Sequence, residues 1–178
     1  MTAFTLIYTD GGNVPPAQMS VEQAADLLSG FDVIFLGEMH RHPGNHLAQM
    51  MLFRVIHERA PDLALSMEQI ERDVQPIVDD YLAGRIGEGP FIEQTRAWGN
   101  YRTSYRPLVE YAKDHGLPVI AANAPGDVVR CVGLEGPEFL DRMNPEQRAW
   151  VAKELHYGEG AYRDKFMGFI MGDAAHGG

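Results

Sequence analysis

The chain has 178 residues, of which 45% are apolar and 22% are charged, and its formal net charge is -10 at pH 7. This length and composition are those of one ordinary globular domain and not of a disordered chain. The negative charge argues against a nucleic-acid surface, which needs a basic stripe, and no apolar run approaches the roughly 20 residues of a membrane span.

Apolar runs of strand length alternate with segments of helical spacing along the chain. In chain order we expect a strand at 4–8, a helix at 21–29, a strand at 31–37, a helix at 45–60, a strand at 63–68, helices at 74–82 and 104–115, a strand at 117–123 and a helix at 145–155. This alternation indicates an α/β fold with a mostly parallel sheet flanked by helices. The chain shows no internal repeat or linker, so we expect a single domain over residues 1–178.

Polar side chains follow three of the predicted strands. Glu38 and His40 come directly after a buried apolar run, Glu68 ends the third strand, and Asn123 ends the fourth. Because sites of open α/β sheets lie beyond the carboxyl ends of their strands, we expect these groups to converge on one rim and to form a pocket. The alternative is that the carboxylates only accept hydrogen bonds from helix N-termini, which is stabilising in its own right.

A divalent metal ion at this rim is one possibility. His40, His46 and Glu68 are residue types that bind such ions, although they would have to come from separate elements. Glu38 would then act as a general base on a metal-bound water, with His40 holding the ion. This is the chemistry of a metal-dependent hydrolase.

A second group of candidate ligands lies in a glycine-rich polar segment near the C-terminus. Its members are His156, Tyr157, Tyr162 and Arg163. A phenolate or an imidazole can ligate ferric haem, and Arg163 or Lys165 could pair with a propionate. The stripe of Trp98, Tyr101 and Tyr105, in contrast, has the spacing of core residues on one helical face, although it could also wall a flat aromatic ligand.

Several blocks of the chain resemble the ChaN-like haem-binding uptake family. The blocks are Phe31–His40 with Pro43 and His46, Leu65–Gln69 with Gln75, Trp98 and Tyr101 with Tyr105–Leu108, and Val119–Pro125. They occur in the family's order over about residues 31–130. The wider superfamily includes erythromycin-esterase-like and TIKI-type metal-dependent hydrolases, in which the equivalent Gly-Glu…His strand end carries the chemistry.

The resemblance implies a protein that binds haem for uptake, transfer or storage without turnover. It implies a tyrosine iron ligand at a homodimer interface, and we assign this role to Tyr162 or Tyr157, with His156 as a hydrogen-bonding or second ligand. It also implies an exported protein, periplasmic or outer-membrane-associated, and often attached to the membrane through a lipid anchor.

The chain departs from the family pattern at both ends. The family usually continues to a late strand that ends in a Gly-x-Gly-His-like motif, and this chain stops before one, so we expect a domain that is incomplete at its C-terminus. Residues 1–4 lack the basic and apolar regions of a signal peptide. Export is therefore implied by the resemblance alone.

Overall fold

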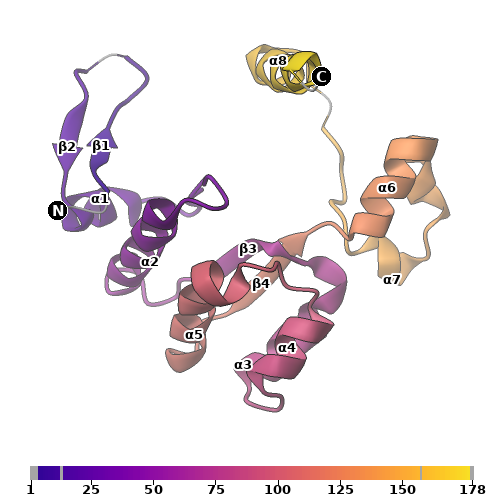
Figure 1. Cartoon of the computed structure of the whole chain (residues 1–178), viewed down its shortest axis with the longest axis horizontal. Coiled ribbons are helices and arrows are strands. Elements are labelled where there is room, and N and C mark those ends of the chain that lie inside the picture. The colour runs from indigo at the N-terminus through magenta and orange to yellow at the C-terminus, as the bar shows by residue number, and fades with distance from the viewer. Residues whose placement is uncertain (1–3, 13, 157, 177–178) are drawn as a thin grey trace.

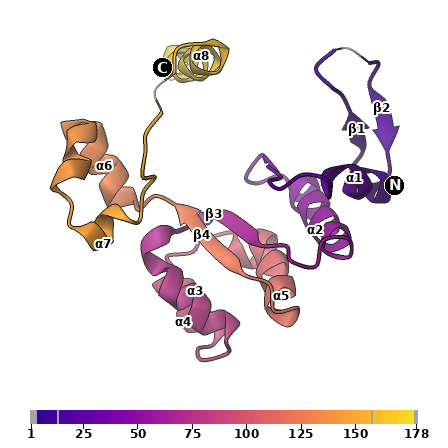
Figure 2. The ribbon, with the colours of Figure 1, turned by 180° about the vertical axis from the view of Figure 1, so that it is seen from behind.

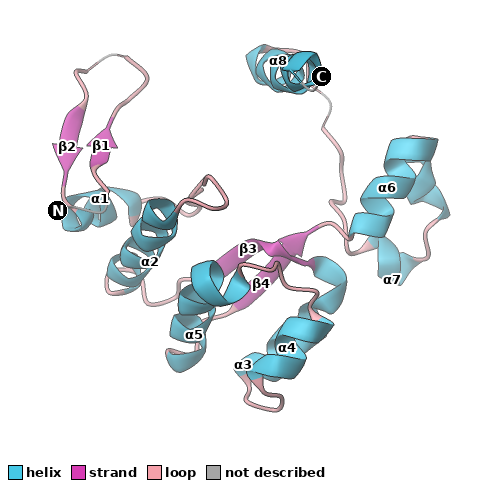
Figure 3. Ribbon diagram, viewed as in Figure 1, coloured by secondary structure: helices cyan, strands magenta, loops and turns pink. Residues whose placement is uncertain are grey.

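A computed structural model describes residues 4–12, 14–156 and 158–176. It confirms the α/β class, with helices around short strands that form two separate sheets (Figures 1 and 3). Strands β1 (Leu6–Tyr8) and β2 (Ala17–Met19) pair antiparallel as a hairpin. Strands β3 (Leu65–Glu71) and β4 (Val119–Asn123) pair parallel at the centre of the molecule.

Two helices follow the hairpin. Helix α1 (Val21–Leu28) begins at a capping box whose Ser-x-x-Gln pattern is visible in the sequence, and in it Ser20 and Gln23 satisfy each other's backbone N–H groups. Helix α2 (Pro43–His57) packs against α1 through a small separate cluster of buried side chains. None of the described helices is long and apolar enough to cross a lipid bilayer.

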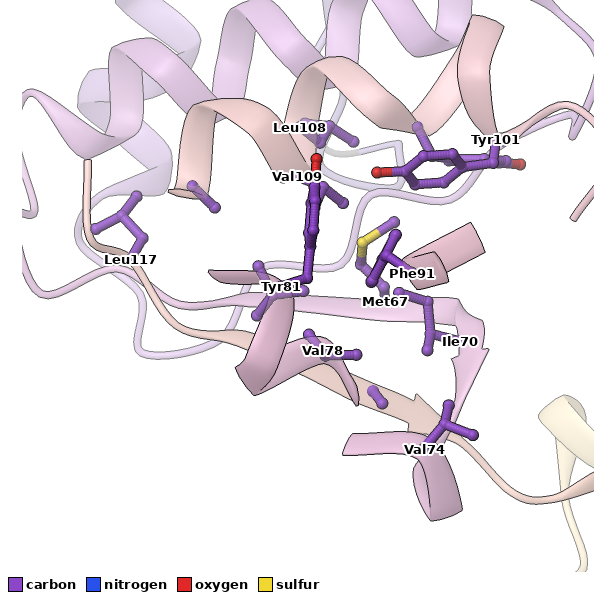
Figure 4. Packing of buried hydrophobic residues seen from close by; sticks show 14 of the residues in the cluster. Met67, Ile70, Val74, Val78, Tyr81, Phe91, Tyr101, Leu108, Val109 and Leu117 are labelled. Carbon is purple, nitrogen blue, oxygen red and sulfur yellow. The ribbon is translucent and has the colours of Figure 1, made fainter. Parts of the chain in front are cut away.

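The main core forms around the parallel strands (Figure 4). It is covered by the 3-10 turn Arg72–Val74, helix α3 (Gln75–Leu82), helix α4 (Glu88–Gln94), the π-helical turn Tyr101–Tyr105 and helix α5 (Arg106–Asp114). Tyr101, Phe91 and Ile70 are among its fully buried side chains. This core fixes where α5 and the π-helical turn lie, and so positions the site below.

The chain after β4 forms helix α6 (Gly126–Glu135), the 3-10 helix Pro137–Arg142, helix α7 (Pro145–Arg148) and helix α8 (Ala161–His176). Helix α7 ends well before residue 155, so the prediction for 145–155 was correct only at its start. Opposite views place α8 apart from the parallel strands (Figures 1 and 2).

The prediction of a buried strand at 31–37 is wrong for the described residues, where the segment forms no strand and Phe35 is 92% exposed. Its apolar, β-favouring composition is a local property, whereas a strand requires a neighbour with which to pair. The parallel sheet of the described chain contains only β3 and β4. Strand β3 also extends beyond residue 68 through an irregularity between Met67 and Glu71, so Glu68 lies within the strand and not at its end.

Candidate functional site

The carboxylate of Glu38 is the centre of a cluster of polar side chains. Its Oε1 accepts a hydrogen bond from the Tyr105 hydroxyl at 2.5 Å and lies 2.9 Å from His40 Nδ1. Its Oε2 accepts one from Gln49 Nε2 at 2.8 Å and lies 3.3 Å from His46 Nδ1. The Glu38 side chain is only 5% exposed, so the protein and not solvent satisfies this carboxylate.

The first turn of α2 fixes the loop that carries Glu38 and His40. His42 caps the helix, since its Nδ1 accepts a hydrogen bond from the Asn45 backbone N–H at 3.3 Å. The Asn45 side chain in turn accepts one from the Met39 backbone N–H at 3.3 Å. The loop is therefore tied to the helix end on both sides of His40.

The partners of Glu38 decide its protonation. Burial favours the neutral acid, but hydrogen bonds from Tyr105, His40 and Gln49, together with nearby His46, outweigh it and hold the pKa of Glu38 below its ordinary value. Burial and the hydrogen bond to Glu38 raise the pKa of Tyr105 to about 12. The pair is thus an ionised carboxylate and a neutral phenol.

His40 presents a ring nitrogen with an accessible lone pair beside this carboxylate. Its side chain is 53% exposed, and its ring meets Trp98 edge-on at a centroid distance of 4.9 Å. With Nδ1–H donating to Glu38, Nε2 carries the lone pair, and no described residue hydrogen-bonds to it. Its backbone oxygen accepts hydrogen bonds from His46 Nε2 and Asn100 Nδ2, each at 3.0 Å. This is the arrangement of a histidine ligand oriented by a carboxylate.

A cavity of about 450 Å³ opens beside the cluster, between the start of α2 and the start of α5. Its apolar lining includes Leu47, Met50 and Pro107, and Arg41 supplies a cation. The volume is in the range of small-molecule sites, roughly 300–1,000 Å³. The N-terminal ends of both helices carry partial positive charge and add to that of Arg41, so this end of the cavity favours an anion.

The structure brings together two of the predicted rim residues, Glu38 and His40, with His46, a predicted metal ligand. Glu68 is exposed within β3, and Asn123 is paired in register with Glu71. In the described part of the chain, no three or more His, Cys, Asp or Glu side chains are arranged so that together they could hold a metal ion. A metal site made by His40, His46 and Glu68 stays a prediction.

The C-terminal candidates lie elsewhere. Tyr162 and Arg163 are exposed on α8, and Tyr162 is 85% exposed. His156 is exposed in the preceding loop, where its Nε2 lies 3.9 Å from a Glu154 oxygen. Tyr157 lies outside the described residues. The assignment of these side chains to haem therefore stays a prediction.

Three members of the cluster were not predicted from the sequence as site residues. Tyr105 matched the family and was expected in the core, where it is indeed buried, but its bond to Glu38 was not expected. It closes a π-helical turn, a rare conformation that is frequent at functional sites. No sequence motif marked Gln49 or Asn100 as a site residue, because amide side chains on elements far apart in the chain form no local motif.

Comparison with known proteins gives one extensive match. A family model described as "Haem-binding uptake, Tiki superfamily, ChaN" matches residues 24–177. The chain is also 26% identical over 111 residues to Protein RETICULATA-RELATED 5, chloroplastic, of Arabidopsis thaliana, a match that covers 58% of this chain and 15% of that protein. The chain therefore spans only a small part of this curated relative. No solved structure matches it significantly.

Proposed function

Since this chain belongs to the ChaN family of haem-binding uptake proteins in the Tiki superfamily, we propose that it binds haem and that His40 is the residue that would hold the iron. The observation that carries this proposal is the pair of His40 and Glu38. The carboxylate accepts a hydrogen bond from His40 Nδ1–H at 2.9 Å, which leaves the lone pair of Nε2 accessible to a metal. An imidazole oriented in this way by a hydrogen-bond acceptor is a common ligand of metals, including haem iron.

Besides a ligand for the iron, haem needs apolar contacts for its macrocycle and positive charge for its propionates, and the surroundings of His40 supply both. The macrocycle needs apolar contacts, and Leu47 and Met50 line the adjacent cavity while Met39 is exposed beside His40. The propionates need positive charge, which Arg41 and the nearby helix N-termini supply. When bound, haem would supply the iron that is carried. The side chains of this chain hold and orient it.

The resemblance supports a different ligand set, which we also propose for test. In it Tyr162 or Tyr157 binds the iron, His156 serves as a second or hydrogen-bonding ligand, and Arg163 pairs with a propionate. The exposure of Tyr162 leaves its hydroxyl accessible to a ligand.

Titration with haemin, followed by absorption spectroscopy, tests both sets. We expect a shifted Soret band in the unaltered protein, loss of that shift in His40→Ala, and a retained shift in a Tyr157→Phe/Tyr162→Phe double variant. The matched control is His42→Asn, which replaces another loop histidine and keeps a capping side chain. An undiminished shift in His40→Ala overturns the His40 assignment. Loss of the shift in the double variant alone favours the tyrosine set.

The cellular role proposed with haem binding is uptake, transfer or storage by an exported protein in the periplasm or at the outer membrane, with a lipid anchor. We also propose a homodimer in which each subunit covers the other's apolar haem face. Light scattering before and after haemin addition tests the dimer. A mass that stays at one chain after saturation with haemin contradicts it.

A metal-dependent hydrolase is the second candidate, and the accessible Nε2 of His40 supports it as well. The chemistry of Glu38 supports it less, because a carboxylate with a lowered pKa and both oxygens in hydrogen bonds is a weak general base. Metal analysis of the purified protein tests the hydrolase candidate. If no stoichiometric divalent ion is found, or hydrolytic activity is unchanged in His40→Ala, this candidate is removed.

A further inference from the structure

We propose that His57 and His115, at the C-terminal ends of α2 and α5, form a binding site for a divalent transition metal, with preference for Cu²⁺. This inference rests on no part of the haem proposal. His57 is the last residue of α2, and His115 follows the last residue of α5. Their ring centroids are 5.4 Å apart, and the ring planes are nearly perpendicular at 84°.

The two helices run parallel, which brings their C-terminal ends together. At their first turns the rings of His46 and Tyr105 are 5.0 Å apart, and at their last turns those of His57 and Tyr111 are 5.7 Å apart. The site is therefore built by the packing of α2 against α5 and does not depend on a loose segment.

Tyr111 orients both imidazoles through their Nδ1 atoms. His115 Nδ1 lies 2.8 Å from the Tyr111 backbone oxygen, which only accepts, so the ring hydrogen is on Nδ1 and Nε2 carries the lone pair. His57 Nδ1 lies 3.0 Å from the Tyr111 hydroxyl, which can accept its hydrogen. No described residue hydrogen-bonds to Nε2 of either ring. The Nδ1 atom of each ring thus has a hydrogen-bond partner, and when the Tyr111 hydroxyl accepts the hydrogen of His57 Nδ1, the Nε2 atoms of both rings carry lone pairs that can bind a metal ion.

The separation of the rings suits one shared ion. An imidazole nitrogen lies about 2.0–2.1 Å from a bound Zn²⁺, which places two ligating rings with their centroids roughly 4.5–6 Å apart. The measured 5.4 Å falls within this interval. Water would complete the coordination, because the described residues add no third metal-ligating side chain.

The local electrostatics favour a cation. Both helices end here, and the partial negative charge of a helix C-terminus stabilises positive charge. The side-chain cations within two residues of either histidine are engaged elsewhere, since Arg59 pairs with Asp26 at 2.5 Å and Lys113 lies over the Tyr81 ring at 3.7 Å. Glu58 and Asp114 are exposed next to the two histidines.

The choice of metal follows from the donors. Imidazole nitrogen suits copper, nickel and zinc, whereas magnesium, calcium and manganese prefer oxygen. For a given nitrogen site the affinity of divalent ions peaks at Cu²⁺. We therefore expect Cu²⁺ to bind more tightly than Zn²⁺, and Mn²⁺ to bind least.

Titration of the full chain with CuCl2 and, separately, ZnCl2, together with electron paramagnetic resonance of the copper form, tests the site. We expect one strong Cu²⁺ site with nitrogen coupling, and a loss of at least about tenfold in affinity in His115→Gln and in His57→Gln. His42→Asn is the matched control and keeps the affinity. Because His115 is exposed, His115→Gln decides alone if His57→Gln fails to fold. Copper affinity unchanged in His115→Gln overturns the proposal, whatever the haemin titration shows.

Discussion

The buried carboxylate of Glu38 links the site to the stability of the fold at the scale of single residues. Its pKa lies below the ordinary value of 4.5, so its ionised form stabilises the folded chain above that value. As the pH falls below 4.5 and through the lowered pKa of the folded state, protonation removes this stabilisation. Stability should therefore fall with pH in this window.

Comparison with Glu38→Gln isolates this effect. The amide cannot titrate, so its free energy of unfolding should change less between pH 5 and about pH 3 than that of the unaltered chain. Urea unfolding at a series of pH values measures both slopes. Parallel slopes in the two proteins would show that Glu38 does not contribute.

The same substitution at two buried tyrosines should have opposite effects. The Tyr101 hydroxyl is buried with no hydrogen-bond partner among the described residues, and burial raises its pKa. Tyr101→Phe removes an unsatisfied group, so we expect stabilisation by about 1 kcal/mol. Tyr105→Phe removes a bond to an ionised carboxylate, so we expect destabilisation by about 1.5–3 kcal/mol. Denaturant unfolding checks both, and equal effects of the two changes would contradict the assignment of these hydroxyls.

At the scale of elements, the end of α4 shows how side-chain contacts hold an unfavourable backbone. Arg96 follows the helix cap with a φ of 53°, in the left-handed region where glycine is usual. Its guanidinium contacts Glu71 at 2.6 Å and Asp73 at 2.7 Å. Both Arg96→Ala and Arg96→Gly lose these contacts, but only glycine relieves the backbone. Arg96→Gly should be the more stable by about 1–2 kcal/mol in thermal unfolding. A more stable Arg96→Ala would show that the backbone is not strained there.

The elements that sequence reasoning located are those with local signals. The capping box placed α1, and apolar spacing placed α3. Helix α4 was missed because Gly87, Gly89 and Pro90 indicate a break, yet Pro90 lies in its first turn, where proline costs little. The strand expected at 31–37 failed because pairing is decided by distant residues. For the same reason the sequence could identify Glu38 and His40 but not Gln49 or Asn100, which reach them only through the tertiary fold.

At the scale of the whole molecule, α2 and α5 pack in parallel, so the two ends of this helix pair favour ligands of opposite charge. Both N-termini lie beside the cavity and Arg41, and both C-termini lie beside His57 and His115. The fold therefore offers an anion-favouring end and a cation-favouring end along one helix pair. The propionates of haem suit the charge of the first end, and its apolar macrocycle suits the Leu47 and Met50 side chains that line the cavity there.

From this difference in charge we predict how much of the binding of haemin depends on the charge of Arg41 and how much on its apolar contacts. Arg41→Gln should weaken haemin binding by roughly twofold to fivefold, which corresponds to about 0.5–1 kcal/mol, the upper part of the range for an exposed ion pair. Haemin dimethyl ester, whose propionates carry no charge, should bind the variant and the unaltered chain equally well. Absorption titrations with both porphyrins measure the two ratios, and Arg102→Gln, which breaks a surface pair with Glu88, is the matched control. An equal loss with the ester would mean that Arg41 acts through packing, because no charge is then available for it to recognise.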